Sequence, residues 1–266
     1  MTQHSNNVYD PAGTQPQPHP PERRVAVSLP ASTPRVTYTI IGVTVFVYLL
    51  QVASDYFLGP SPIGINWLEY LGAKFNDFIR AGQLWRFFTP MLLHASPLHI
   101  GFNMYALYAF GNGLEQRLGH RRFFLLYILS GFAGSVMSFL FTSGYSIGAS
   151  GAIFGLIGAE GVFLYQNRKL FGTKAMKAMQ NVIFVVAFNL FLGLQPHIDN
   201  WGHIGGLAGG LIFSWFASPL WQVEGIAPAL RLVDQREPRE VGIGVSLVVI
   251  LFCVLAAIGM WFPFVK

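Results

Sequence analysis

Seven apolar segments recur along this 266-residue chain, each close to the length of roughly 20 residues that a helix needs to cross a bilayer. The chain is 53% hydrophobic and 11% charged, whereas soluble domains carry about a quarter charged residues. We therefore expect an all-α, polytopic membrane protein with seven spans. The segments are centred on residues 38–56, 96–112, 122–142, 150–166, 179–194, 200–218 and 242–264.

The stretches outside these segments have distinct compositions. Residues 1–34 are polar and rich in proline, which predicts a disordered tail because little apolar surface is available to bury. Residues 57–95 are rich in aromatic side chains but carry too many charges to span the membrane. We therefore expect a loop that lies in the membrane interface. Residues 219–240 are predicted to be a charged cytoplasmic linker, and residues 241–266 to contain the seventh span.

Lysine and arginine are unevenly shared between the two sides that alternate along seven spans. Thirteen lie on the side of the N-terminus and four on the opposite side. Because cytoplasmic loops are enriched in positive charge, this split predicts a cytoplasmic N-terminus and an external C-terminus. The richer side holds Arg23, Arg24, Arg35, Arg117, Arg121, Arg122, Arg168, Lys169, Lys174, Lys177, Arg231, Arg236 and Arg239, and the other side holds Lys74, Arg80, Arg86 and Lys266.

The same split accounts for the net charge of +5 and the isoelectric point near 9.4, so no nucleic-acid partner is expected. The single cysteine, Cys253, excludes an intramolecular disulfide and a metal site built on thiolates. We expect neither a metal nor another cofactor. The tail lacks the arginine-rich amphipathic character of an organelle transit peptide, which favours a bacterial cell membrane.

Polar residues begin three of the apolar segments, each just after an external loop. The octapeptide GASGAIFG puts Ser150 at the start of the fourth segment, and NWGHIGGLAGG puts His203 at the start of the sixth. His99 and Asn103 open the second segment and share one helix face because of their i,i+4 spacing. Since a serine becomes an effective nucleophile beside a base, these residues predict a hydrolytic site near the outer surface.

Glycines on the fourth and sixth segments predict how Ser150 and His203 meet. The fourth segment carries Gly151, Gly155 and Gly158, and the sixth carries Gly202, Gly206 and Gly210. Rows of small residues let two helices approach closely in lipid. We expect these two segments to pack tightly and to bring His203 within hydrogen-bond distance of Ser150.

Five motifs occur in order between about residues 70 and 218. They are LWRFFT with Trp85 and Arg86, HIGFN with His99 and Asn103, E-x-R-x-G with Glu115 and Arg117, GASGAIFG, and IDNWGHIGGLAGG. Together they resemble the rhomboid family of intramembrane serine proteases. The resemblance implies a rhomboid-like six-helix catalytic core, placed here at residues 35–218, with one additional C-terminal transmembrane helix. It also implies cleavage within or beside the transmembrane helices of substrate proteins.

The resemblance further implies a role for each site residue. Ser150 would attack the scissile carbonyl, and His203 would serve as general base and then as acid. The oxyanion would be stabilised by the side chains of His99 and Asn103 and by the backbone at Gly148 and Ser150. Phe154, where many relatives have tyrosine, is expected to pack on His203. Structural roles are expected for Trp85, Arg86, Glu115, Arg117, Gly151, Gly155, Gly206 and Gly210.

Plainer interpretations stand beside these. Ser150 would then be a small packing residue, and His203 a structural histidine bonded to a neighbouring helix. Asp199 is more simply an N-cap than a third catalytic residue, and Glu160 is expected to be protonated or ion-paired inside the bundle. Two other classes stay open: a catalytically inactive relative that binds transmembrane clients, and a seven-span transporter, although transporters place polar groups near the midplane.

Overall fold

Seven long helices form the body of the protein. The computed structural model describes residues 33–196, 198–226, 229–262 and 264, so the predicted disordered tail lies almost entirely outside the described residues. Each long helix coincides with one of the seven apolar segments to within a few residues, which confirms the helical prediction. They are α1 (Arg35–Leu58), α4 (Pro97–Leu118), α5 (His120–Phe141), α6 (Ser150–Gln166), α8 (Thr173–Leu192), α9 (Asn200–Ala217) and α10 (Pro238–Trp261).

Shorter elements fill the connections. Between α1 and α4 lie the helices α2 (Trp67–Gly72) and α3 (Asn76–Arg80) and the 3-10 turns η1 (Leu84–Phe87) and η2 (Thr89–Leu92), and the four-residue helix α7 (Arg168–Phe171) precedes α8. The predicted linker 219–240 contains a two-stranded antiparallel hairpin instead, with β1 (Trp221–Glu224) paired to β2 (Arg231–Asp234). The all-α prediction is therefore corrected to a mostly helical fold.

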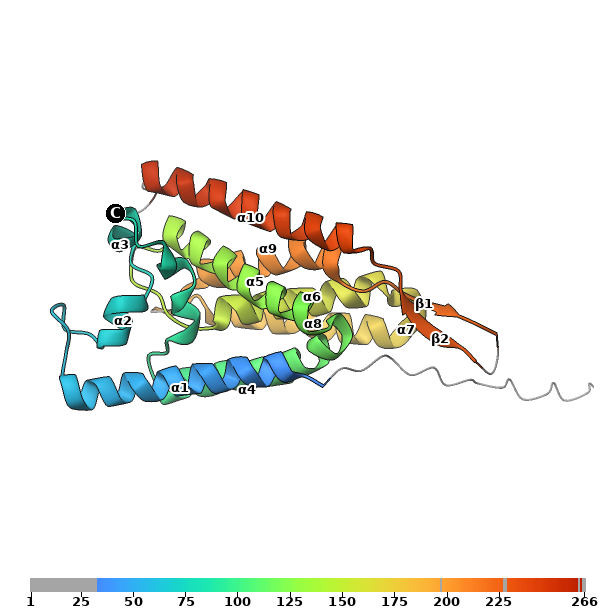
Figure 1. Ribbon diagram of the computed structural model, residues 1–266, viewed down its shortest axis with the longest axis horizontal. Helices are drawn as coiled ribbons and strands as arrows, with labels where there is room; N and C mark the ends of the chain where they lie inside the picture. The colour runs from blue at the N-terminus through green and yellow to red at the C-terminus, as the bar shows by residue number, and fades with distance from the viewer. Residues whose placement is uncertain (1–32, 197, 227–228, 263, 265–266) are drawn as a thin grey trace, which may run out of the picture.

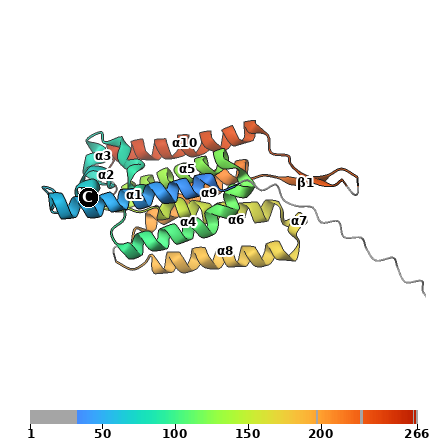
Figure 2. The ribbon, with the colours of Figure 1, turned by 60° about the horizontal axis from the view of Figure 1, so that its bottom comes forward.

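The helices run side by side, and the short elements gather at the two ends of the bundle (Figure 1). One end carries α2, α3 and the turns that follow them, and the other carries α7 and the projecting hairpin. Helix α9 packs against both α5 and α6, and α10 packs on α5 and α9. Helices α1 and α4 lie beside each other, while α8 lies at the edge of the bundle against α6 (Figure 2).

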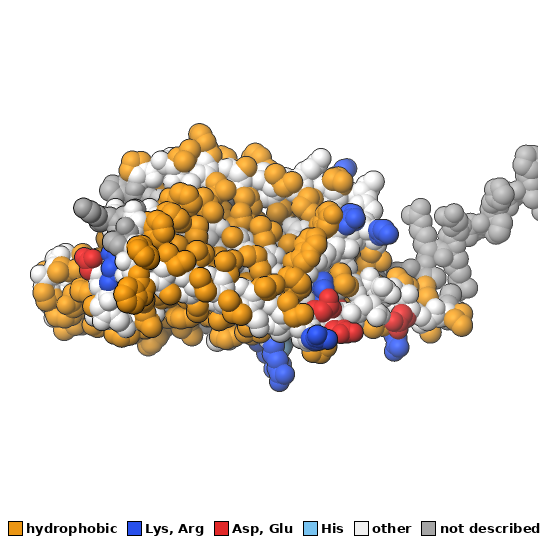
Figure 3. Space-filling model, turned by 90° about the horizontal axis from the view of Figure 1, so that it is seen from above, with side chains coloured by type: hydrophobic (Ala, Val, Ile, Leu, Met, Phe, Trp, Pro, Cys, Tyr) orange, Lys and Arg blue, Asp and Glu red, His pale blue; other side chains and the backbone are white. Residues whose placement is uncertain are grey.

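Four of the helices in the described ranges are long and apolar enough to cross a membrane: α1, α5, α8 and α10. Helix α6 has only 17 residues, and α4 and α9 are interrupted by histidine, asparagine and glycine. Hydrophobic side chains cover the middle of the molecule, and most charged ones gather toward the end with the hairpin (Figure 3). The chain is thus a multi-pass membrane protein, whereas the full set of seven spans stays a prediction.

Half-buried polar side chains explain where two of the long helices begin. Ser96 caps α4 by accepting the His99 N–H at 3.1 Å, and Pro97 occupies the first helical position, where no N–H is needed. Asp199 caps α9 by accepting the Gly202 N–H at 3.1 Å, as the N-cap prediction required. These caps fix the helix starts at the end of the bundle that carries the predicted site.

The interface between α6 and α9 is made by glycines, as expected. A β-carbon added at Gly206 would lie 1.9 Å from the Gly151 carbonyl oxygen, and one at Gly210 would lie 2.4 Å from the Gly155 α-carbon. Both distances are far below van der Waals contact, so no larger residue fits without moving a helix. The absence of side chains therefore sets the separation of the two helices that carry Ser150 and His203.

Candidate active site

Ser150 is the first residue of α6 and follows a turn that requires glycine. Gly148 has φ of +127°, a backbone conformation that residues with a side chain rarely adopt. A helix leaves its first N–H groups without intrahelical acceptors, so the Ser150 N–H lies at such a position. The turn thus presents a hydroxyl and a backbone donor together at the end of the helix.

His203 meets Ser150 across the glycine interface. Its Nε2 lies 2.9 Å from the Ser150 Oγ, within ordinary hydrogen-bond distance, although the two residues are 53 positions apart in the sequence. Both side chains are half-buried. The expected approach of the two segments is therefore present, and a serine and a base lie in the geometry that nucleophilic catalysis requires.

Asp199 does not extend this pair into a triad. Its Oδ1 accepts the Gly202 N–H at 3.1 Å and the Thr142 hydroxyl at 2.7 Å. Within the described part of the chain, the buried Nδ1 of His203 has no hydrogen-bond partner. The aspartate holds the start of α9, and the geometry is that of a dyad.

Phe154 lies one turn after Ser150 and fixes the plane of the histidine ring. The two ring centroids are 4.4 Å apart, and the planes differ by 6°, so the rings are stacked. Phe154 is itself buried. The contact expected from the sequence is present without any hydroxyl on the aromatic ring.

His99 and Asn103 face the turn that precedes Ser150. A β-carbon on Gly148 would lie 2.8 Å from His99 Nε2 and 3.8 Å from Asn103 Nδ2. The Ala95 N–H donates to His99 Nδ1 at 3.4 Å, which leaves the ring proton on Nε2, the nitrogen that faces the turn. Two side-chain donors from α4 therefore converge near the nucleophile.

The backbone N–H of Gly148 was expected to help stabilise the oxyanion, and the structure gives it another partner. Its N–H donates to the Pro90 carbonyl at 2.9 Å and is already engaged. We correct its role to a conformational one, because the positive φ and the missing side chain let the turn lie against His99. The Ser150 N–H is the backbone donor that stays a candidate.

Side-chain donors help to hold the fold of the loop 57–95. Arg86 is almost fully buried and donates to the carbonyls of Ala73 at 2.6 Å and Tyr70 at 2.7 Å. The exposed Trp85 donates its indole N–H to the Leu71 carbonyl at 3.1 Å. These contacts are structural, as the sequence predicted for both residues.

His94 lies between this loop and His99. Burial, reinforced by the neighbouring His99, lowers the pKa of His94 to about 3, so its imidazole is neutral near pH 7. The two imidazoles meet edge to face, with centroids 5.0 Å apart. His94 thus packs against His99, a candidate oxyanion donor.

The E-x-R-x-G motif at the far end of α4 makes two separate connections. Glu115 accepts the backbone N–H groups of Val36 at 2.8 Å and Thr37 at 2.7 Å, which fastens the first turn of α1 to α4. Arg117 forms a two-pronged ion pair with Glu160 of α6, with one N–O distance of 3.0 Å. The second of the two expectations for Glu160, ion pairing, is therefore the one observed.

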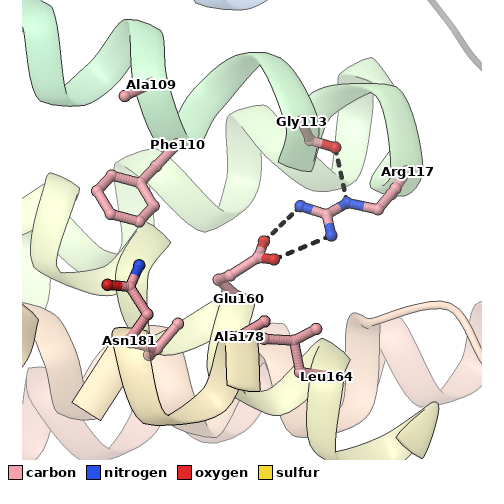
Figure 4. Close-up of a pocket in the computed structure, with 9 residues that line it drawn as sticks. Ala109, Phe110, Gly113, Arg117, Glu160, Leu164, Ala178 and Asn181 are labelled. Atoms are coloured by element: carbon pink, nitrogen blue, oxygen red, sulfur yellow. Dashed lines mark hydrogen bonds and ion pairs between the residues drawn. The ribbon is translucent and has the colours of Figure 1, made fainter. Parts of the chain in front are cut away.

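A cavity of about 210 Å³ adjoins this ion pair between α4, α6 and α8 (Figure 4). Arg117 and Glu160 form part of its wall, with Phe110 and Asn181 opposite. None of the lining residues belongs to the Ser150–His203 pair or to its donors, so this cavity is separate from the candidate active site. Among the described residues, no group of three or more histidine, cysteine, aspartate or glutamate side chains is placed to hold a metal.

Comparison with known proteins gives a consistent result. The rhomboid domain family matches residues 81–220. The chain is 41% identical over 160 residues to RHOMBOID-like protein 1 of Arabidopsis thaliana, covering 59% of this chain and 40% of that protein. It is 38% identical over 182 residues to rhomboid protease GluP of Bacillus subtilis, covering 66% of this chain and 34% of that protein.

A third relative is RHOMBOID-like protein 6, mitochondrial, of Arabidopsis thaliana. It is 42% identical over 156 residues, which cover 58% of this chain and 50% of that protein. The chain therefore spans between 34% and 50% of the length of these three relatives. The matched region, residues 81–220, includes α4, α5, α6, α8 and α9 and hence every residue of the candidate site.

Proposed function

The chain belongs to the rhomboid family, which includes intramembrane serine proteases, and from that premise we propose that it is an intramembrane serine endopeptidase. One observation carries the proposal: the Ser150 Oγ and His203 Nε2 lie 2.9 Å apart, at the starts of two helices of a membrane protein. The substrates are membrane proteins, cut within or next to their transmembrane helices. The reaction needs no metal or other cofactor.

The proposed reaction begins with attack by the Ser150 Oγ on the scissile carbonyl carbon. His203 Nε2 accepts the hydroxyl proton as the new C–O bond forms, and the carbonyl oxygen becomes an oxyanion. His203 then donates that proton to the leaving amine as the C–N bond breaks, which leaves an acyl-enzyme. A water molecule, deprotonated by His203, hydrolyses the ester and restores Ser150.

Three donors are available for the oxyanion. They are the Nε2–H of His99, the side-chain amide of Asn103 and the backbone N–H of Ser150. Loss of one such donor in soluble proteases costs about 3–4 kcal/mol of transition-state stabilisation. Phe154 supports the reaction indirectly, because its stacked ring holds the His203 imidazole in one plane.

We further propose a topology that places the site near the outer surface. The seven long helices would cross the bilayer with a cytoplasmic N-terminus and an external C-terminus, as the distribution of lysine and arginine predicts. Residues 35–218 would form the catalytic core, and α10 would be an additional span. A bacterial cell membrane, with the site on its extracytoplasmic side, is the location we propose.

The proposal is tested with purified full-length protein and a single-span substrate whose helix contains a helix-breaking residue near the cut site. We expect cleavage by the wild type and its loss in both Ser150→Ala and His203→Ala. Binding of the substrate without cleavage by any variant would indicate an inactive client-binding protein. Equal cleavage by Ser150→Ala and the wild type would exclude Ser150 as nucleophile.

A further inference from the structure

A buried lysine lies in the loop between α2 and α3. Lys74 has no solvent-exposed surface, and its ammonium donates to the Asn76 Oδ1 at 3.0 Å, the Thr142 carbonyl at 2.8 Å and the Gly144 carbonyl at 2.8 Å. All three ammonium protons therefore have acceptors. Burying a charge is costly unless it is fully hydrogen-bonded, and loss of any of these acceptors would leave the buried ammonium with an unpaired proton. We therefore expect Lys74 to keep the three acceptors in place.

The acceptors belong to the segment that leads into Ser150. Thr142 and Gly144 lie in the connection from α5 to α6, which ends at the nucleophile. The Lys74 backbone holds the same connection through a pair of hydrogen bonds with Ser146, at 3.0 Å and 3.1 Å. One residue thus fixes three positions of the connection that aims Ser150.

A second line of hydrogen bonds runs from the same point to the start of α9. The Thr142 hydroxyl donates to the Asp199 Oδ1 at 2.7 Å, and that oxygen also accepts the Gly202 N–H at 3.1 Å. Gly202 immediately precedes His203. The Thr142 carbonyl accepts from Lys74 and also from the Asn76 amide at 3.1 Å, while the Thr142 hydroxyl donates to Asp199. A continuous chain of hydrogen bonds therefore links Lys74 to both arms of the dyad.

We propose that Lys74 is a positioning residue for the dyad, whose ammonium fixes the segment before Ser150 and, through Thr142 and Asp199, the helix start that carries His203. The inference rests on the proposed serine-protease function. Lys74 touches neither Ser150 nor His203, so its effect is on their alignment. A misplacement of catalytic groups by about 1 Å can reduce the rate of reaction by about a hundredfold. Loss of the alignment that Lys74 supports should therefore slow the reaction strongly.

The test measures how fast Ser150 reacts with a fluorophosphonate, which the serine oxygen attacks at phosphorus with release of fluoride. This probe needs no transmembrane substrate, so it reports the reactivity of the site around Ser150 without a step of substrate-helix binding. In Lys74→Met, we expect labelling to slow by roughly tenfold to a hundredfold at a temperature where thermal unfolding shows the variant folded. Lys169→Met, which removes an exposed lysine of α7, is the matched control and should label like the wild type.

The outcomes separate this inference from the proposed function. If the wild type shows no serine labelling at all, the protease proposal fails. If the wild type labels and folded Lys74→Met labels within twofold of it, the protease proposal stands and the positioning role of Lys74 is wrong.

A pH series on the wild type decides the question if Lys74→Met does not fold. Burial lowers the pKa of the Lys74 amine to about 8, with Asp199 opposing the shift and Arg80 adding to it. The pKa of Asp199 is lowered by its hydrogen bonds, so this carboxylate stays ionised as the Lys74 amine loses its proton. We expect labelling to fall as the pH is raised through about 8, in the wild type and in Lys169→Met alike, with circular dichroism unchanged. A labelling rate that stays constant or rises up to pH 10 would overturn the inference.

Discussion

The α6–α9 interface and the loop 57–95 both hold parts of the candidate site, but by opposite means. The helix interface depends on missing side chains, since a β-carbon at Gly206 would lie 1.9 Å from the Gly151 carbonyl oxygen. The loop depends on long buried side chains, since Arg86 and Lys74 donate to backbone carbonyls that no regular element satisfies. The helix interface depends on close packing of two backbones, and the loop depends on hydrogen-bond donors from side chains.

The difference follows from where each backbone finds its hydrogen bonds. A helix satisfies its own N–H and C=O groups, so two helices need only shape to come together. An irregular loop leaves carbonyls unpaired, and buried carbonyls need donors from elsewhere. The helix interface should therefore fail when atoms are added, and the loop should fail when donors are removed.

The largest effect is expected for Gly206→Val. The added side chain would overlap the backbone of α6, which separates the helices and destabilises the protein by about 3 kcal/mol or more. Thermal unfolding in detergent and substrate cleavage should both be strongly impaired. Gly42→Val in α1 is the matched control because nothing lies within 4 Å of its added β-carbon, and it should behave like the wild type. Full activity in Gly206→Val would refute the packing argument.

A somewhat smaller effect is expected for Arg86→Met, which keeps the apolar stem and removes the donors. The carbonyls of Ala73 and Tyr70 would be left without their partner, at a cost of about 2–3 kcal/mol in the free energy of unfolding. Chemical denaturation in detergent would measure this loss. Arg121→Met, at an exposed arginine, supplies the comparison. Equal stability of the two variants would mean that the loop does not depend on the Arg86 donors.

Phe154→Leu should change the reaction more than the stability. The variant loses the stacked ring under His203, an interaction worth about 1 kcal/mol beyond its buried area. Cleavage should slow severalfold with only a small decrease in the thermal midpoint, whereas Phe154→Tyr keeps the ring and should retain most activity. Identical cleavage rates for the leucine and tyrosine variants would show that the stacking is irrelevant to His203.

The smallest effect is expected in α8, which contributes to neither arrangement. Of its most apolar 18-residue window, 11% is buried, against 72% for the corresponding window of α5. Phe184 is 65% exposed, so Phe184→Ala should shift the free energy of unfolding by less than about 0.5 kcal/mol. A loss as large as that of Arg86→Met would show that α8 is held by contacts that the fold does not reveal.

The helix interface was predictable from the sequence, and much of the loop was not. Glycines spaced four apart mark one face of each helix, so the meeting of Ser150 with His203 follows from local pattern. Lys74 gives no such signal, because its acceptors at Thr142 and Gly144 lie about 70 positions away and are backbone atoms, which every residue has. Sequence pattern identifies side-chain chemistry but not which carbonyl lacks a donor.

The same reasoning explains the other differences. The partner of Glu160 could not be read from the sequence because Arg117 lies 43 positions away on another helix. The hairpin in the predicted linker was missed because its strands have only four residues each, too few for a clear alternation. The family resemblance implied an oxyanion role for Gly148, and the hydrogen bond from its N–H to the Pro90 carbonyl could not be foreseen because it depends on how the loop folds back.

The central claim is that Ser150 is a nucleophile activated by His203, and its most direct test is to locate the covalent adduct formed with a fluorophosphonate. Intact mass and peptide mapping of the labelled full-length protein should find one adduct, on Ser150. In His203→Ala, which keeps the serine, labelling should fall to the level of Ser150→Ala. An adduct on another serine, or undiminished labelling of Ser150 in His203→Ala, would contradict the account.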